Sequence, residues 1–427
     1  MIILYRTLTI LIYPLLIILV FLRRLQNKED AKRYKEKIFP SFFNVCRKKN
    51  TKLIWFHAAS IGELNSILPI IKNLNESNKN FEFLITTVTL SSSNLAKEKI
   101  KNFQNVYHRF FPIDVRFIMK KFLLSWKPDA IFFVDSEIWP NIILEIKKLK
   151  IPIALINARI TSKTFKKWMY ISKDAKKIFN NFDMCLASNL ETKKYLENLN
   201  ANKIIYTGNI KLINKVEEEK LRSPNDKILE ISKFWIAAST HRGEENFCLN
   251  THLILKKRHQ NIITILAPRH IDRAAEIKKL CDDLNLSSQI LTKDQIISSN
   301  KEILIINSFG ALNNFYKFSK SVFIGKSLLK EFDKVGGQNP IDAAKLGCKI
   351  YHGPFVYNFN EIYDFLNLNN ISKKITSADE LAHQLTSDFD QIKKDTQKFA
   401  DIINKLGSKT LNDTMTNINK FLVNEIK

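Results

Sequence analysis

Residues 55–63 read "WFHAASIGE", and residues 235–244 read "WIAASTHRGE". Each string begins with an apolar run typical of a buried strand, passes through small residues typical of a tight turn, and ends where a helix can begin. A strand, a turn and a helix in this order open a doubly wound α/β domain. The recurrence of the pattern predicts two related domains of this kind in one chain.

The sequence around both strings alternates in the same way. Short apolar runs such as "AIFFVD" (130–135) and "IITILAPRH" (262–270) alternate with stretches such as "NIILEIKKLK" (141–150), which are apolar on one helical face. This alternation is typical of a parallel sheet with helices on both faces. The predicted fold class is therefore α/β, with two doubly wound Rossmann-like domains facing a central cleft.

The pattern also predicts where the domains begin and end. Around residues 212–227 it lapses into charge, proline and asparagine, as expected of a linker. The predicted division is a membrane-anchor helix at 1–22, an N-terminal Rossmann-like domain at 23–211, a linker at 212–227, a C-terminal Rossmann-like domain at 228–375, and C-terminal helices at 376–427 that can pack back on the N-terminal domain.

Composition and charge limit the class of protein. The 427 residues are 45% hydrophobic and 26% charged, as in a globular protein. The net charge of +25 suggests an anionic partner, which could be nucleic acid, an acidic membrane or a phosphorylated substrate. An AT-rich coding sequence would also enrich lysine, so the charge has limited weight. The five cysteines are odd in number and widely spaced, which predicts reduced thiols and no zinc site.

The N-terminus predicts membrane attachment. Residues 1–22 carry one charge, Arg6, and as a single helix would be about 33 Å long. The apolar run is not followed by the small residues of a signal-peptide cleavage site. Residues 23–37 contain seven basic and three acidic side chains. By the positive-inside rule, the domains behind this flank stay cytoplasmic. The prediction is a single anchor helix, with a helix lying in the membrane interface as the alternative.

Glu63 is the one charged residue between residues 57 and 71. Its spacing from Ser60 is that of a capping box, in which the serine side chain bonds the glutamate N–H and the carboxylate reaches back to the serine N–H. The position also suits a catalytic base at a strand end. From the residues alone, both interpretations remain open.

Two further polar segments follow apolar strands in the first half. "VDSEIWPN" (134–141) places Asp135 and Glu137 where carboxylates could orient substrate hydroxyls or cap the next helix. "TGNIK" (207–211) places Lys211 at another strand end, shortly before the predicted linker.

Two segments of the second half could bind an anion. In "APRHIDRA" (267–274), the Arg269 guanidinium at a strand end suits a phosphate or carboxylate, although a plain basic surface cluster is an equal alternative. In "GGQNPIDAAKLG" (336–347), two glycines allow close backbone approach to a ligand. Asn339 suits the N-cap, Pro340 the first helical position and Asp342 a box-like cap, so this segment could be no more than a good helix start.

Several common motifs do not occur. The chain has no P-loop, no G-x-G-x-x-G string and no G-x-S-x-G elbow. Its one D-x-D string, "DFD" at 388–390, lies in the polar C-terminal region. The sequence therefore predicts no metal site and no cofactor.

Seven strings, taken together, resemble the bacterial 3-deoxy-D-manno-octulosonic acid (Kdo) transferases. They are "FHAASIGE", "DSEIWPN", "NARIT", "TGNIK", "ASTHRGEE", "APRHIDRA" and "GGQNPIDAA…HGP…NF", in collinear order. The resemblance implies a glycosyltransferase B fold and inverting, metal-independent transfer of Kdo from CMP-Kdo to the phosphorylated lipid A precursor, lipid IVA. It also implies a place at the bacterial inner membrane in lipopolysaccharide biosynthesis, with no nucleic-acid partner.

The resemblance implies that the domain at 23–211 binds the acceptor and the domain at 228–375 binds the CMP donor, and it also assigns residues. It implies that Glu63 is the general base and that Glu137 and Lys211 stabilise the reacting sugar or the transition state. The implied CMP-binding positions are Pro268, Arg269, Gly310, Ala311, Gly336, Gly337, Asn339 and Asp342.

The chain departs from the family pattern mainly in the donor half. Ala311 replaces a glutamate, Gln338 a histidine, Asp342 a glutamate and Lys326 a glycine, which puts individual CMP contacts in question. The alternatives are another nucleotide-sugar transferase of the same fold with a different lipid or glycan acceptor, a degenerate member without activity, and a membrane-tethered nucleic-acid-binding protein.

Overall fold

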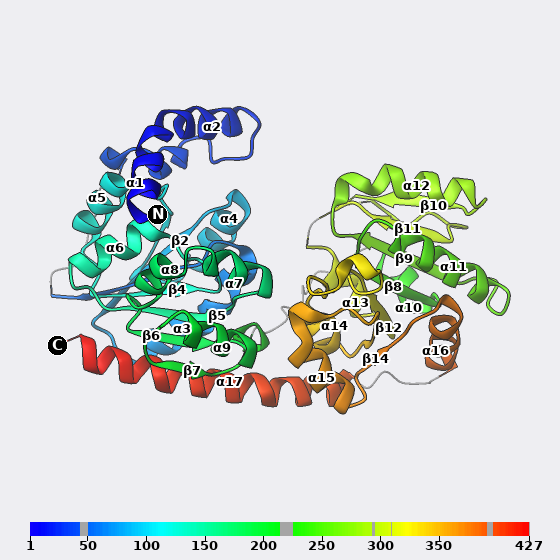
Figure 1. The fold of residues 1–427 in the computed structure, drawn as a ribbon. Coiled ribbons are helices and arrows are strands. Elements are labelled where there is room, and N and C mark those ends of the chain that lie inside the picture. Colours follow the sequence, from blue (N-terminus) through cyan, green and yellow to red (C-terminus); the bar gives the residue numbers. More distant parts are fainter. Residues whose placement is uncertain (43–49, 214–224, 293–294, 309, 391–395, 427) are drawn as a thin grey trace. The chain divides into compact units, whose positions relative to one another are not determined.

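The computed structural model of the protein describes residues 1–42, 50–213, 225–292, 295–308, 310–390 and 396–426. It divides into two compact units, one made of Met1–Asn214 with Gly407–Lys427 and the other of Lys215–Leu406 (Figure 1). Each unit contains one parallel sheet of seven strands. Most of the predicted linker lies outside the described residues.

The sheet of the first unit has the strand order β3-β2-β1-β4-β5-β6-β7. The chain starts in the middle, winds outward to β3, and returns to wind outward on the other side, which is the doubly wound topology predicted from the alternation. The strands are β1 (Lys52–His57), β2 (Phe81–Thr87), β3 (Val106–Phe110), β4 (Ala130–Val134), β5 (Ile153–Ala158), β6 (Met184–Ala187) and β7 (Ile204–Tyr206).

Helices bury both faces of this sheet. One face carries Trp55 and Phe133 against α5, α6 and α8, and the other carries Phe56 and Phe132 against α3 and the C-terminal part of α17. Burial on both faces explains why the strands are almost continuously apolar. The helices are α3 (Ile61–Ser77), α4 (Leu90–Lys99), α5 (Arg116–Trp126), α6 (Pro140–Lys148), α7 (Ser162–Met169), α8 (Ser172–Phe179), α9 (Leu190–Asn198) and α17 (Thr396–Glu425).

The second unit is also doubly wound, with the order β10-β11-β9-β8-β12-β13-β14, in which β11 lies between β9 and β10. Its first strand, β8, begins at Phe234 and again lies in the middle of the sheet, as β1 does in the first unit. The strands are β8 (Phe234–Thr240), β9 (Ile263–Pro268), β10 (Ser288–Leu291), β11 (Ile303–Ile306), β12 (Ser321–Ile324), β13 (Lys349–His352) and β14 (Ser372–Lys374).

The helices of the second unit include α11, α12 and α16, which pack their apolar side chains against one face of its sheet. Of the remaining, shorter helices, one precedes β8 and the others each lie between two successive strands. The set is α10 (Asp226–Ile231), α11 (Glu244–Lys256), α12 (Ala274–Asp283), α13 (Leu312–Tyr316), α14 (Ile341–Lys345), α15 (Asn360–Leu368) and α16 (Ala378–Asp390).

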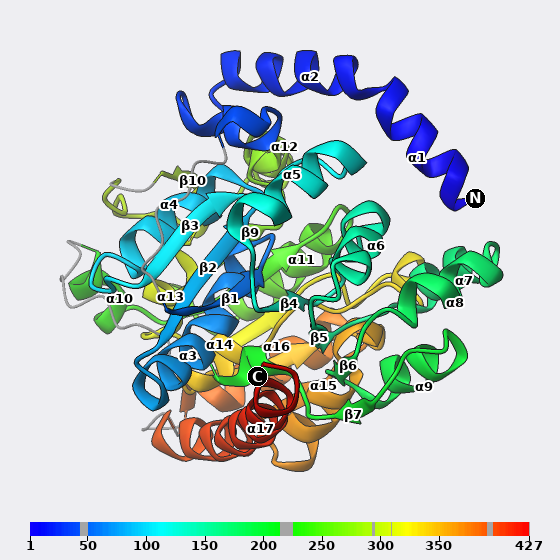
Figure 2. The same cartoon turned by 90° about the vertical axis from the view of Figure 1, so that its left-hand side faces the viewer.

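The prediction of one continuous helix over residues 1–22 is wrong. The segment forms α1 (Ile2–Leu11) and α2 (Tyr13–Leu25), which meet at an angle of 56° (Figure 2). Pro14 accounts for the break, because it has no N–H to donate to the carbonyl of Ile10, four residues earlier, and its ring crowds that carbonyl. No single described helix is long and apolar enough to cross a bilayer, whereas this bent pair reaches that length and composition together.

The first helix is attached to its unit by polar side chains. The Tyr5 hydroxyl donates to Asp114 at 2.9 Å, and the Arg6 guanidinium contacts Glu145 at 3.3 Å. The rest of α1 and α2 exposes apolar side chains to the outside: Ile3, Leu4, Leu8, Ile10, Leu11, Ile12, Leu15, Ile18, Leu19, Phe21, Leu22 and Leu25.

Candidate active site

Glu63 lies in the first turn of α3, directly after the carboxyl end of β1. The Ser60 hydroxyl accepts the Glu63 N–H at 3.4 Å, so the predicted cap forms. The reciprocal bond differs from the prediction. The Glu63 carboxylate accepts the Ala59 N–H at 2.8 Å and the Ser60 hydroxyl at 2.7 Å, and not the Ser60 N–H. The carboxylate is therefore fixed by the turn that precedes the helix.

The surroundings of Glu63 suit a base. Burial raises the pKa of its carboxyl, the bonds from Ser60 and Ala59 oppose this change, and the nearby charges of Asp135 and Glu137 add to it. A carboxylate with a raised pKa holds a proton more strongly than an ordinary one, so it accepts a proton from a hydroxyl more readily near neutral pH.

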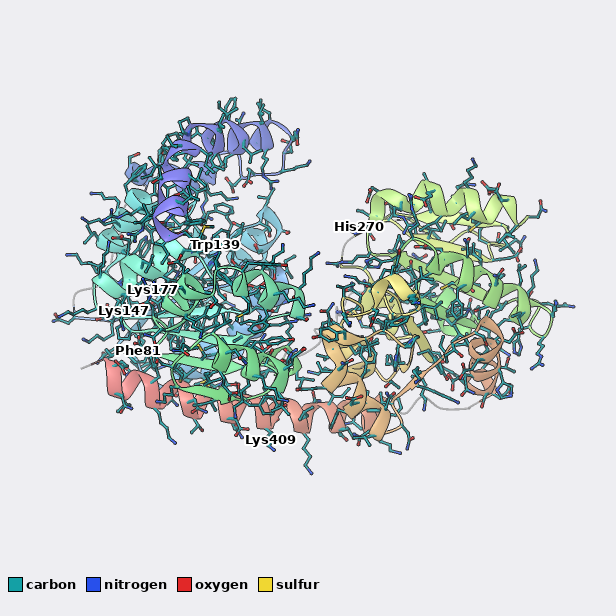
Figure 3. All side chains as sticks on the ribbon, viewed as in Figure 1. Phe81, Trp139, Lys147, Lys177, His270 and Lys409 are labelled. Atoms are coloured by element: carbon teal, nitrogen blue, oxygen red, sulfur yellow. The ribbon has the colours of Figure 1, made fainter. Side chains whose placement is uncertain are left out.

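Asp135 and Glu137 follow the carboxyl end of β4. Asp135 has a φ of +62°, a conformation that side chains seldom adopt and that is frequent at functional sites. One Glu137 oxygen lies 3.2 Å from His57 Nε2 and 2.8 Å from the indole nitrogen of Trp139. Trp139 is labelled in Figure 3. Burial by itself would raise the pKa of Glu137, but the contacts with His57 and Trp139 lower it below its usual value.

Lys211 lies in the short 3-10 helix η3 (Ile210–Ile213) after β7. Its ammonium is 2.8 Å from Asp135, and both side chains are largely buried. The loop is supported by α17, because the α-carbon of Gly407 approaches the backbone so closely that a Cβ would lie 2.6 Å from the Leu212 carbonyl oxygen. The C-terminal helix thus helps to hold Lys211 in place.

The structure therefore brings Glu63, Glu137 and Lys211 to one edge of the first sheet, around Asp135. Asp135 pairs with Lys211, and its charge contributes to the pKa of Glu63. The carboxyl ends of parallel strands are where ligands bind in open α/β sheets. His57 was not predicted as a site residue; its place at the last position of β1 was the available signal.

In the second unit, Glu244 organises the equivalent edge. Its side chain is fully buried at the start of α11, and each carboxylate oxygen accepts two backbone N–H groups. One oxygen bonds His241 and Lys326 at 2.9 and 2.6 Å, and the other bonds Ser327 and Leu328 at 2.8 and 3.1 Å. Glu244 therefore joins the loop after β8 to the loop after β12.

Glycines allow the neighbouring loops to pack backbone against backbone. A Cβ on Gly336 would lie 2.3 Å from the Phe355 carbonyl oxygen, and one on Gly353 would lie 2.2 Å from that of Ser327. Gly337 has a φ of +92°, and its N–H donates to the Lys326 carbonyl at 2.7 Å. The predicted donor-binding segment is thus tied to the loop that Glu244 holds.

Comparison with known proteins identifies the family. Residues 26–214 match the family model described as 3-deoxy-D-manno-octulosonic-acid transferase (kdotransferase). A 3-deoxy-D-manno-octulosonic acid transferase from Rickettsia bellii is 30% identical, over 90% of this chain and 89% of its own length. This chain belongs to the Kdo transferase family. It is therefore a glycosyltransferase, and the resemblance drawn from the seven strings is confirmed.

Other relatives agree with this family. A probable mitochondrial Kdo transferase from Arabidopsis thaliana is 30% identical over 84% of this chain and 81% of its own. Among solved structures, a putative UDP-N-acetylglucosamine 2-epimerase from Listeria monocytogenes is similar with a TM-score of 0.60, over 86% of this chain and 96% of its own, at 12% identity. A glycosyltransferase from Rickettsia africae has a TM-score of 0.57, over 87% and 98%, at 13% identity. These structures support the fold of two α/β domains.

The predicted donor-binding residues of this Kdo transferase follow strands of the second sheet. Pro268 ends β9, and the exposed Arg269 follows it near His270, which Figure 3 labels. Gly310, with a φ of +80°, and Ala311 lie between β11 and α13. Ala311 also lines a small pocket with Ser308, Asn314 and side chains of α10.

The segment with Asn339 and Asp342 differs slightly from its prediction. α14 begins at Ile341, one residue later than expected, so Pro340 precedes the helix instead of opening it. The predicted N-cap is also one residue off: Pro340 and not Asn339 holds that position, and the Asn339 side-chain oxygen accepts the Ile341 N–H at 3.1 Å from the residue before it. Asp342 lies in the first turn, where burial raises the pKa of its carboxyl.

The "DFD" string has a structural role. Asp388 lies on α16 and accepts the hydroxyls of Ser321 and Tyr351, both at 2.6 Å. Within the described ranges, no three His, Cys, Asp or Glu side chains are placed to hold a metal ion. The four cysteines that the structure describes are buried free thiols: Cys185, Cys248, Cys281 and Cys348.

Proposed function

We propose that this Kdo transferase moves Kdo from CMP-Kdo to the lipid A precursor, lipid IVA, in lipopolysaccharide biosynthesis, with Glu63 as general base. The observation that carries the proposal is the half-buried Glu63 carboxylate, with its raised pKa, beside Asp135, Glu137 and Lys211 at the edge of the first sheet. Membership of the Kdo transferase family supplies the sugar that is transferred.

In the proposed reaction, Glu63 takes the proton from an acceptor sugar hydroxyl as that oxygen attacks the anomeric carbon of Kdo. The bond from this carbon to the CMP phosphate breaks, and CMP leaves with the bonding electrons. One attack from the face opposite the leaving group inverts the anomeric centre. We assign Lys211 and Glu137 to stabilising the charge that develops around the sugar, since preorganised charges act strongly in a largely buried site.

We assign CMP binding to the second unit. The candidates are Arg269 for an anionic group of the donor and Asp342 for the ribose hydroxyls, with close backbone approach at Gly336 and Gly337. This assignment is supported by the loops themselves, which Glu244 and the glycines hold in fixed positions. No metal or other cofactor has a part in this proposal.

We also propose that α1 and α2 lie in the cytoplasmic face of the bacterial inner membrane and do not cross it. Side chains of α1 bond the folded unit, as in the Tyr5–Asp114 and Arg6–Glu145 pairs, and a helix in the hydrocarbon core could not keep these bonds. The outer side of the pair is apolar, and Lys120 and Lys121 are exposed on α5, which packs against α1. An apolar surface flanked by basic residues is typical of interfacial attachment to anionic lipid.

Vesicle binding tests this attachment. The protein should co-sediment with vesicles that contain phosphatidylglycerol, and Leu15→Glu combined with Leu19→Glu should weaken binding at least tenfold, because two exposed apolar groups are replaced by anions. Leu190→Glu, at an exposed leucine of α9, is the matched control and should bind normally. An N-terminal tag should be accessible from the side of the catalytic units; a tag protected on the opposite side would show that the segment crosses.

The reaction itself is tested with purified protein, CMP-Kdo generated in situ and tetraacylated lipid A precursor, followed by the mass of the product. We expect mass increases of whole Kdo units, whose number the spectrum counts, and inhibition by CMP but not by UDP. Inhibition by UDP would indicate another nucleotide-sugar transferase. A folded protein that binds CMP but forms no product would be a degenerate member, for which the Ala311 departure is the first candidate cause.

A further inference from the structure

A line of four buried or largely buried side chains lies behind the predicted site in the first unit. The indole nitrogen of Trp55 is 2.9 Å from the Thr86 hydroxyl, and the same hydroxyl is 3.0 Å from His57 Nδ1. His57 Nε2 is in turn 3.2 Å from Glu137. Trp55, Thr86 and His57 are completely buried, so this line connects the core of the sheet to a carboxylate of the site.

The chemistry of the four groups gives the line a direction. An indole N–H can only donate, so Trp55 donates to the Thr86 oxygen. The Thr86 hydroxyl then has its own proton free to donate to His57 Nδ1. A proton on Nε2 donates to Glu137, whereas a bare Nε2 would direct its lone pair at a carboxylate oxygen. The Glu137 contact therefore places a proton on Nε2. His57 Nδ1 is 3.0 Å from the Thr86 hydroxyl and 3.3 Å from the Thr86 carbonyl oxygen. The shorter contact, with the hydroxyl as donor, completes a chain in which each group donates to the next.

The packing around His57 fixes the ring. It stacks on Phe111 with centroids 3.8 Å apart and an angle of 19°, and it meets Phe133 edge to face at 5.4 Å. A fully buried ring held between two aromatic side chains cannot rotate without displacing them. The Nε2–H group is thus held in one place, toward Glu137.

Glu137 needs this donor because other anionic groups lie close to it. In the part of the chain that the structure describes, His57 of β1 lies 3.2 Å from Glu137, and the charges of Glu137 and Asp135 both act on Glu63 of α3. Asp135 is paired with Lys211 of η3, and its carbonyl accepts the N–H of Arg159, which follows β5. Lys211 is therefore partly neutralised by Asp135, and His57 and Trp139 are the groups that donate directly to the Glu137 carboxylate.

We propose that His57 is a positioning residue for the transfer reaction: it keeps Glu137 ionised and oriented beside Glu63 through a hydrogen-bond chain that begins at Trp55. The inference rests on the proposed function. Its consequence is that two neighbouring carboxyl groups have separate states, with Glu137 a permanent anion and Glu63 the group that exchanges a proton.

The pH dependence of kcat/KM tests this role. In the natural protein, one ionisation, that of Glu63, should govern the acid limb, so log(kcat/KM) should rise with a slope of one. His57→Leu removes the donor, and both carboxyls must then lose a proton for activity. In this variant, the acid limb of log(kcat/KM) should shift to higher pH and its slope should approach two. At neutral pH, kcat/KM should fall about tenfold, as expected for the loss of a hydrogen bond to a charged group.

Conservative variants separate positioning from folding. His57→Gln keeps an N–H donor at about the place of Nε2 and should restore the slope of one. Thr86→Val removes the hydroxyl while it keeps the side-chain shape, and should shift the limb in the same direction as His57→Leu but less; Thr86→Ser should not. If His57→Leu is folded and loses activity equally at every pH, or loses none, the proposal is wrong. If His57→Leu does not fold, Thr86→Val is the deciding variant: a folded Thr86→Val enzyme whose acid limb does not shift would show that the proposal is wrong.

A measurement without turnover distinguishes this proposal from the proposed function. NMR of protein labelled with 15N-histidine reports the ring form of His57, which we expect to be the neutral Nε2–H tautomer, and to be altered by Thr86→Val. A ring protonated at Nδ1 would overturn the chain even in an active enzyme. If the ring has the expected tautomer but the protein makes no Kdo product, the hydrogen-bond chain is supported and the proposed reaction is wrong.

Discussion

Glu63→Gln should reduce the rate of Kdo transfer by a factor of about 10²–10⁴ without unfolding the protein, because general-base catalysis contributes an acceleration of this size. Glutamine retains an oxygen that can accept the Ala59 N–H, and the Ser60 hydroxyl can turn to accept from the new amide. The helix cap therefore persists, while the group that accepts the proton is lost. Product formation under single-turnover conditions, with circular dichroism of the same sample, measures both.

The pH profile adds a second test of Glu63. Burial raises its pKa, so the carboxyl stays protonated to a higher pH than usual and becomes a base only above that pKa. The activity of the natural protein should therefore fall on the acid side at a pH above the ordinary carboxyl range, and the residual activity of Glu63→Gln should lack this limb. Glu76→Gln, at the exposed end of the same helix, is the matched control. A folded Glu63→Gln enzyme with normal turnover would make Glu63 a cap only.

The sequence predicted the fold well because both sheets are buried on both faces. Strands such as β1 and β4 are almost entirely apolar, and helices between them show the helical period. Strands β10 and β14, at the two edges of the second sheet, are less buried and less apolar. β14 reads "SKK" with two exposed residues, so it carries no apolar pattern that could reveal it.

For the N-terminal segment, the sequence-based prediction was wrong. The apolar residues at 1–22 predict one long helix by hydropathy, but hydropathy takes no account of the effect of one proline on helix geometry. The bend before Pro14 and the bonds made by Tyr5 and Arg6 decide how the segment lies. Those bonds join residues more than one hundred positions apart, which no local pattern contains.

The site was predicted in part. Glu63 stands out locally, as a lone charge at a helix start, and the family resemblance singled out Glu137 and Lys211. The contacts that hold them join distant parts of the chain: His57 of β1 meets Glu137 after β4, and Asp135 after β4 meets Lys211 after β7. They depend on strand order and register, so they become visible only in the folded sheet.

Glu244→Gln should destabilise the second unit and weaken donor binding. The carboxylate accepts four backbone N–H groups, two on each oxygen. A glutamine amide offers one acceptor oxygen, and its NH2 group would face two N–H donors. Leaving two buried donors unsatisfied costs about 3 kcal/mol or more. In a domain of this size, that free energy lowers Tm by about 6–12 °C.

The expected effect on CMP-Kdo binding follows from one further hydrogen bond. Lys326, whose N–H is held by Glu244, accepts the Gly337 N–H at 2.7 Å, so release of this loop also releases the predicted CMP-binding segment. KM for CMP-Kdo should rise about tenfold or more, as for an interaction worth about 1.4 kcal/mol, while KM for the lipid acceptor stays nearly constant. Glu276→Gln, at a carboxyl of α12 with arginine partners, should leave both Tm and KM close to those of the natural protein. If Glu244→Gln melts with the natural protein and binds CMP-Kdo equally well, these loops are held by their glycine packing and not by the buried carboxylate.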